Sequence, residues 1–127
     1  MFKAGEIVKY SPKFCGPGEE FYIHEVKEVN PDTDRILIST LNTMLTLGST
    51  SRVSSEMIQK ANRFEIIVTR DSNLQTVYAI TDTEAKKVFA GYDFMGSIDW
   101  VDGLTEAYLM DLDEAEAILT DMNNAEC

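Results

Sequence analysis

Three stretches of the first 41 residues have the pattern of apolar residues expected of β-strands, and in the second the apolar positions are shared between both sides of the strand. The stretches are rich in β-branched and aromatic residues and cover positions 5–11, 20–29 and 35–41. The Pro12–Gly18 segment separates the first two. Residues 30–34, Asn-Pro-Asp-Thr-Asp, form a turn sequence, because Pro presets φ and Asn and Asp bond nearby backbone. The sequence therefore predicts a hairpin over residues 20–41.

The pattern is weaker between positions 42 and 61. Residues 42–53 have no clear period, although Gly48–Ser51 marks a break and Arg52-Val53 indicates a short strand. Ser54 and Ser55 can cap a helix, and the residues up to Ala61 are helix formers. One or two helical turns are predicted there.

A second hairpin is predicted in the middle of the chain. Strands at 63–69 and 76–81 flank a turn at Asp71–Asn73, and Phe64, Ile66 and Val68 face one way along the first of them. Residues 82–87 fit a turn or a short helix. Further strands are predicted at 88–94, where Gly91 weakens the pattern, around Trp100, and at 107–109.

The C-terminal segment has the period of an amphipathic helix. Asp111 can cap the helix while Glu114, three residues later, reaches back, as in a capping box. Acidic residues also suit the positive end of the helix dipole. We expect Asn123-Asn124 to end the helix. Its apolar stripe consists of Leu112, Ala115, Ile118, Leu119 and Met122. Its outward-facing positions are Asp113, Glu116 and Thr120.

These elements predict an α+β protein of two parts. Residues 1–62 would form a small β-barrel, and residues 63–127 a small antiparallel sheet with one C-terminal helix. The linker at 59–63 is short, so we expect the two parts to contact one another.

The order of elements resembles known architectures. About the first 60 residues resemble an SH3-like small barrel in the order of their elements. That order is strand, Gly/Pro loop, long strand, Asn-Pro-Asp turn, strand, short strand and helical turn. The second half resembles a β-β-β-α module of uncharacterised phage and mobile-element proteins. The resemblance rests on the hairpin at 63–81, Trp100, the 107–109 strand and the helix that opens Asp-Glu-Ala-Glu-Ala-Ile-Leu. Barrels of this class bind nucleic acids, bind peptides or assemble, so the first resemblance implies a fold and no single function.

Charge distinguishes the two halves. The net charge of the chain is −11. Residues 1–62 contain seven bases and eight acids, whereas residues 63–127 contain four bases and fourteen acids, and no Lys or Arg follows Lys87. Such a surface repels nucleic acid and anionic lipid within a Debye length of roughly 8 Å and attracts basic protein surfaces. We therefore expect no direct nucleic-acid binding by the second half and no membrane partner.

Catalytic and metal motifs are not evident. Cys15 and Cys127 are far apart and form no disulfide framework or zinc spacing, so a cytoplasmic location is expected, with no secretion signal or membrane span. The single histidine, His24, lies in a predicted strand, where packing is commoner than catalysis. We expect that the protein is not an enzyme and needs no cofactor, and an enzymatic function is kept as a minor alternative.

Two acidic segments were considered as cation sites. The 30–34 turn begins like an EF-hand loop, but Arg35 occupies the position that needs Gly, and Leu41 the position that needs Glu. Asp93, Asp99 and Asp102 could converge on a cation, but a solvated acidic loop is favoured, and we expect no metal site.

The acidic half is the candidate partner-binding surface. Its carboxylates could imitate backbone phosphates and dock on a basic nucleic-acid channel of another protein. Tyr92, Trp100 and Phe94 are candidate aromatic anchors, although core packing is the favoured expectation for each of them. This predicts a non-enzymatic phage or mobile-element inhibitor of the anti-CRISPR or anti-restriction type. The candidate acidic residues are Asp93, Asp99, Asp102, Glu106, Asp113 and Glu116.

Two other readings of the acidic half stay open. Surface acids also keep proteins soluble without any partner. A small structural or assembly protein that forms oligomers is the alternative function.

Overall fold

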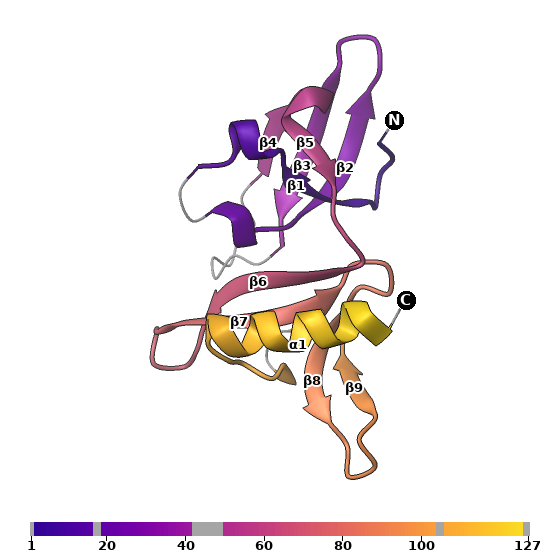
Figure 1. Cartoon of the computed structure of the whole chain (residues 1–127). Helices are drawn as coiled ribbons and strands as arrows, with labels where there is room; N and C mark the ends of the chain where they lie inside the picture. Colours follow the sequence, from indigo (N-terminus) through magenta and orange to yellow (C-terminus); the bar gives the residue numbers. More distant parts are fainter. Residues whose placement is uncertain (1, 17–18, 42–49, 104–105, 126–127) are drawn as a thin grey trace. The chain divides into compact units, whose positions relative to one another are not determined.

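The computed structural model describes residues 2–16, 19–41, 50–103 and 106–125. The chain divides into two compact units, Met1–Ala61 (unit 1) and Asn62–Cys127 (unit 2). Each unit contains one antiparallel sheet, and unit 2 adds a C-terminal helix (Figure 1). The predicted α+β class is confirmed.

Unit 1 is a five-stranded sheet with the order β4-β3-β2-β1-β5. Three short 3₁₀ helices, Pro12–Phe14, Glu19–Phe21 and Ser55–Met57, interrupt the strands. β4 and β5 are the two edges of the sheet, so the predicted barrel is not closed by strand pairing. The strands are β1 (Ile7–Tyr10), β2 (His24–Asn30), β3 (Arg35–Thr40), β4 (Thr50–Val53) and β5 (Ile58–Lys60).

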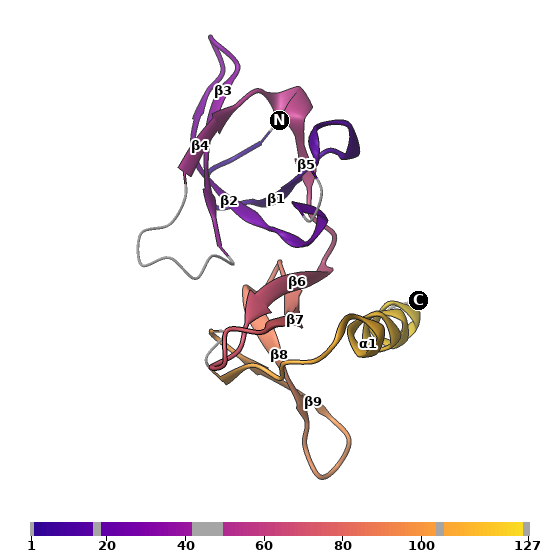
Figure 2. The same ribbon diagram turned by 90° about the vertical axis from the view of Figure 1, so that its left-hand side faces the viewer.

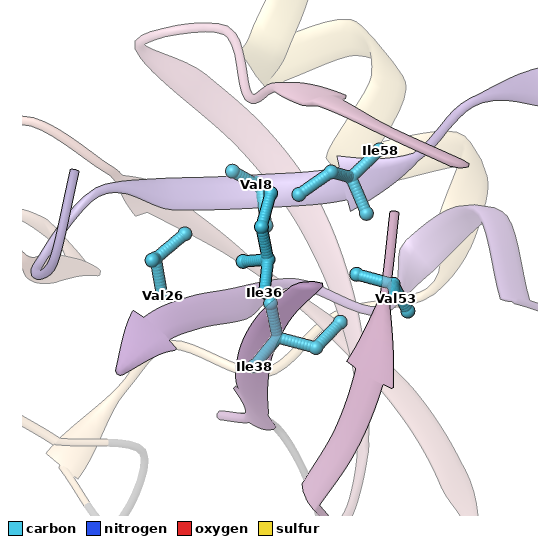
Figure 3. Close-up of a cluster of buried hydrophobic side chains, with 6 residues drawn as sticks. All are labelled: Val8, Val26, Ile36, Ile38, Val53 and Ile58. Carbon is cyan, nitrogen blue, oxygen red and sulfur yellow. The ribbon is translucent and has the colours of Figure 1, made fainter. Parts of the chain in front are cut away.

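The core of unit 1 takes one or two side chains from every strand. They point toward one another inside the curved sheet (Figure 3), and each is at most 4% exposed. Half-buried Tyr10 and Met57 pack against them. In β3, Ile36 and Ile38 face the core while Leu37 between them faces outward, as the alternation of side chains along a strand requires. The six core residues are Val8, Val26, Ile36, Ile38, Val53 and Ile58.

Two predictions in unit 1 are wrong in detail. The predicted helix at 54–61 is a single 3₁₀ turn, and Ile58–Lys60 instead forms β5, because β5 pairs with β1, with Ile58 opposite Tyr10. Residues 59 and 60 therefore belong to a strand and not to a linker. The predicted strand at 20–29 begins only at His24, after the second 3₁₀ helix. Residues 42–49 lie outside the described residues, and so does the first part of the predicted break at Gly48–Ser51.

Unit 2 is a four-stranded sheet, β6-β7-β8-β9, followed by one helix. The helix lies along β6 and β7 (Figure 1) and packs against both. Ala115 and Met122 of the apolar stripe are buried, while Asp113, Glu116 and Thr120 are exposed, as predicted. The elements are β6 (Phe64–Arg70), β7 (Thr76–Asp82), β8 (Lys87–Tyr92), β9 (Ile98–Val101) and α1 (Leu112–Ala125).

The sheet differs from the β-β-β-α order that the resemblance implied, and from the strands predicted for this part of the chain. Residues 107–109 form no strand: the Tyr108 N–H bonds the Phe89 carbonyl (2.9 Å), and Met110 makes one bridge with Tyr78. This segment fits there because β7 and β8 pair only at Thr81–Val88 and Asp82–Lys87 before they part. α1 also continues past the predicted end at Asn123-Asn124, to Ala125.

Gly91 disturbs β8, as predicted. The register of β8 with β9 shifts between Phe89 and Tyr92, and Gly91 there has φ of 106°. An L residue rarely adopts that conformation. The shift bends the far end of the hairpin, which carries the turn discussed below. No helix in the described part of the chain is long and apolar enough to cross a membrane.

Candidate functional site

The predicted acidic residues lie on three parts of unit 2. Asp93 begins the β8–β9 turn, Asp99 lies in β9 and Asp102 follows it. Glu106 lies in the segment that leads to α1. Asp113 and Glu116 are three residues apart on α1, a spacing that places them on the same side of a helix.

Asp93 is half-buried and shapes its turn. Its Oδ1 accepts hydrogen bonds from the Met95 N–H (2.8 Å) and the Ser97 N–H (2.9 Å). Its own N–H donates to the Ser97 carbonyl (2.8 Å), and its carbonyl accepts from the Gly96 N–H (3.0 Å). Asp93 is therefore a structural residue of the turn, and its carboxylate is engaged there.

The other five predicted acids are exposed, and one of them is paired. Asp102 forms an ion pair with Lys87 of β8. Asp99, Glu106, Asp113 and Glu116 have no ion-pair partner or side-chain hydrogen bond among the described residues. These four residues, which we call the unpaired acids, are the part of the predicted surface that keeps its full charge.

The bases of unit 2 are engaged elsewhere. The Arg63 Nε lies 3.4 Å from Asp82 Oδ2 and 3.7 Å from Glu84 Oε2. The Arg70 guanidinium donates to the Leu74 carbonyl (3.3 Å). Three of the four bases of unit 2 therefore bind groups other than the unpaired acids, Lys87 being the third.

The start of α1 is fixed by local hydrogen bonds. Asp111 Oδ1 accepts the Glu114 N–H (2.8 Å), as the predicted cap requires. The reciprocal half of the predicted capping box is replaced, because Glu114 Oε2 instead accepts the Tyr108 hydroxyl (2.8 Å). That hydrogen bond to a carboxylate, with the charge of Glu114, raises the pKa of Tyr108 above its usual value.

The predicted aromatic anchors have different environments. Trp100 is half-buried, stacks on Phe64 (ring centroids 5.9 Å apart) and meets Phe89 edge to face (6.2 Å). Trp100 is thus part of the packing of unit 2. Tyr92 is 53% exposed, with one edge-to-face contact to Phe89.

The most exposed apolar side chains lie in the turn after Tyr92. Phe94 is 99% exposed and Met95 is 78% exposed. Figure 2 shows this turn at the free end of the β8–β9 hairpin. Met95 was not among the predicted site residues. The sequence does carry a signal for both, since Asp-Phe-Met-Gly-Ser places two apolar residues inside a turn sequence.

The single histidine of the chain is buried in unit 1. His24 is 5% exposed, its Nδ1 lies 3.0 Å from the Thr40 hydroxyl, and Tyr10 meets the ring edge to face. Burial lowers the pKa of His24 to about 4. Cys15 is half-buried, and its Sγ lies 3.7 Å from the Gly16 carbonyl oxygen. Within the described ranges, no group of three His, Cys, Asp or Glu side chains is placed to hold a metal ion.

Comparison with protein-family models, with curated proteins and with solved structures finds no match for this chain.

Proposed function

We propose that the chain is a non-enzymatic interaction protein that docks on a basic surface of a partner protein through the unpaired acids of unit 2. The observation that carries this proposal is that Asp99, Glu106, Asp113 and Glu116 are exposed without a neutralising partner among the described residues. Unneutralised charge of one sign attracts a partner of opposite sign and raises the rate of encounter.

The partner we propose is a host protein whose basic surface binds nucleic acid. Carboxylates can occupy such a surface in place of phosphates, because both present oxygen acceptors to Lys and Arg. The chain would then be a phage or mobile-element inhibitor of a nucleic-acid-binding enzyme, of the anti-CRISPR or anti-restriction type, acting in the cytoplasm.

For unit 1 we infer an SH3-like arrangement. The strand order β4-β3-β2-β1-β5 and the 3₁₀ turn between β4 and β5 support it. This fold class hosts many activities, so the inference concerns architecture and leaves the binding function with unit 2.

A matched pair of variants tests the docking proposal. The first combines Asp99→Asn, Glu106→Gln, Asp113→Asn and Glu116→Gln. The control combines Glu20→Gln, Glu28→Gln, Asp32→Asn and Glu56→Gln, all exposed residues of unit 1. Each set removes four negative charges from a chain of net charge −11, so the two variants differ in where charge is lost and not in how much.

The measurement is retention of proteins from a bacterial lysate on the immobilised chain, with elution by salt and by double-stranded DNA. We expect the wild type and the control to retain a basic nucleic-acid-binding protein that elutes between about 50 and 300 mM salt. The first variant should lose at least about tenfold of that affinity. Equal losses in both variants, or retention that is indifferent to salt and to DNA, would contradict the proposal.

A further inference from the structure

The turns of two hairpins in unit 2 have the same geometry and different exposed residues. Residues 71–75 connect β6 to β7 and residues 93–97 connect β8 to β9. In each, an Asp side chain accepts two backbone N–H groups, at 2.9 and 3.0 Å in the first turn and 2.8 and 2.9 Å in the second. The backbone bonds also correspond, Asp71 N–H to Gln75 carbonyl matching Asp93 N–H to Ser97 carbonyl.

This correspondence shows that the fold does not require apolar residues in the second turn. Phe94 and Met95 stand where the first turn has Ser72 and Asn73. Polar residues thus form the same turn in the same unit. An almost fully exposed Phe is costly to keep in water, so Phe94 and Met95 are best explained by a contact with another surface.

Unit 1 carries a hollow that suits this turn. It has a volume of about 620 Å³ and lies on the outward side of β2, β3 and β4. Leu37 lines it and faces outward: it pairs with Glu28 on one side and Arg52 on the other, while its neighbours Ile36 and Ile38 face the core. Pro31 adds apolar lining, and Arg35 adds a second guanidinium.

Charge matches the hollow to the turn. Arg35 and Arg52 are exposed and have no ion-pair partner among the described residues, and Glu28 is the one acidic group in the lining. The β8–β9 hairpin carries Asp93 and Asp99 and no base after Lys87. An apolar pair flanked by carboxylates would therefore meet Leu37 and Pro31 flanked by two guanidinium groups.

We propose that Phe94 and Met95 of one chain insert into this hollow on unit 1 of a second copy of the chain. Two apolar side chains fit within the volume of the hollow, and the flanking Asp99 would lie near Arg35 or Arg52. The contact joins two different surfaces, the turn of one copy and the hollow of another. If each of two copies inserts its turn into the hollow of the other, a dimer forms; if each copy binds a further copy, a longer assembly forms. A contact of this size predicts weak association, with a dissociation constant of about 100 µM.

Sedimentation velocity of the full chain tests the proposal, over about 10 µM to 1 mM. The wild type should sediment faster as concentration rises. Two variants should each weaken association at least about tenfold. The tip variant combines Phe94→Ser and Met95→Asn, which copies the sequence of the other turn, and the hollow variant combines Arg35→Glu and Arg52→Glu.

Mixing the two variants gives the sharpest test. The tip variant keeps an intact hollow and the hollow variant keeps an intact tip, so an equimolar mixture should associate more strongly than either variant alone. A control with Ser72→Ala and Asn73→Ala should associate like the wild type, and circular dichroism shows whether every variant is folded.

Three outcomes would overturn the proposal. They are a wild type that stays monomeric at the highest concentration, association that survives in both variants, and a mixture no stronger than its components. Neutralising Glu106, Asp113 and Glu116, which lie outside the β8–β9 hairpin, should weaken lysate binding while self-association persists, so this contact and the docking function fail separately. Binding of the wild type, but not the tip variant, to uncharged phosphatidylcholine vesicles together with a monomeric wild type would assign the tip to lipid instead.

Discussion

His24 is the residue whose protonation opposes folding of unit 1. The ring is buried beside Tyr10, its Nδ1 is near Thr40, and no partner is described for its Nε2. Since burial lowers the pKa of folded His24 to about 4, from 6.5, the unfolded chain binds a proton between these pH values and the folded chain does not. The stability present above pH 6.5 is therefore lost as the pH falls toward 4.

The expected result is a pH-dependent difference between the wild type and His24→Gln. Urea unfolding at pH 7 and at pH 4.5 should show that the wild type loses about 2 kcal/mol more unfolding free energy than the variant. The carboxylates titrate in both proteins, so the variant is the control for them. If both proteins lose the same free energy, the histidine is not the cause.

The sequence predicted the fate of individual residues unevenly. The exposure of Asp99, Glu106, Asp113 and Glu116 was predictable, because charged residues are seldom buried without a partner. The engagement of Asp93 by turn amides and of Asp102 by Lys87 was not, because those bonds depend on how the hairpin closes. For Trp100 core packing was favoured over a role as an anchor, and its stacking on Phe64 agrees with that, but the partner could be found only once β6 and β9 were placed in one sheet.

Turns are the element in which unit 2 carries backbone strain. Leu74 has φ of 62° at the position where the second turn has Gly96, with φ of 84°. Left-handed backbone costs an L residue about 1–2 kcal/mol, whereas glycine adopts it freely but is more flexible when unfolded. Leu74 is also 68% exposed, so its side chain contributes little packing.

Exchanging these residues should move stability in opposite directions. Leu74→Gly should raise the unfolding free energy by about 0.5–1 kcal/mol, and Gly96→Ala should lower it by about 1 kcal/mol. A Cβ at position 96 would meet no atom within 4 Å, so the loss would come from the backbone and not from a clash. Thermal and urea unfolding of both variants measures the effect, and a stabilising Gly96→Ala would show that the turn is not strained.

Elements set by local sequence were predicted best. The period of α1 and its Asp111 cap lie within one segment, and the helix, its stripe and the cap were confirmed. β5 was predicted as helix because its strand character comes from pairing with β1, some 50 residues away. Residues 107–109 look like a strand in isolation, but only Met110 has a bridging partner on β7.

At the scale of the whole molecule, charge repulsion should limit stability. Unit 2 holds nearly all of the net charge of −11, and like charges on a compact surface oppose folding. Raising the salt concentration from about 10 to about 150 mM shortens the Debye length and should raise the melting temperature by a few degrees.

The matched charge variants test where this repulsion lies. Neutralising the unpaired acids should raise the low-salt melting temperature and reduce its response to salt, while the unit 1 set should do so less. Differential scanning calorimetry measures both. Identical salt responses in the two variants would mean that the repulsion is spread over the chain and not concentrated in unit 2.

The paired turns of unit 2 also make the protein a natural display scaffold. One aspartate oxygen orders each loop through main-chain amides alone, and residues as different as Ser-Asn and Phe-Met occupy the same two positions. A library randomised at positions 94 and 95, without proline at 95, would therefore present many dipeptides on the same backbone, so that selected binders would report side-chain chemistry more than loop shape.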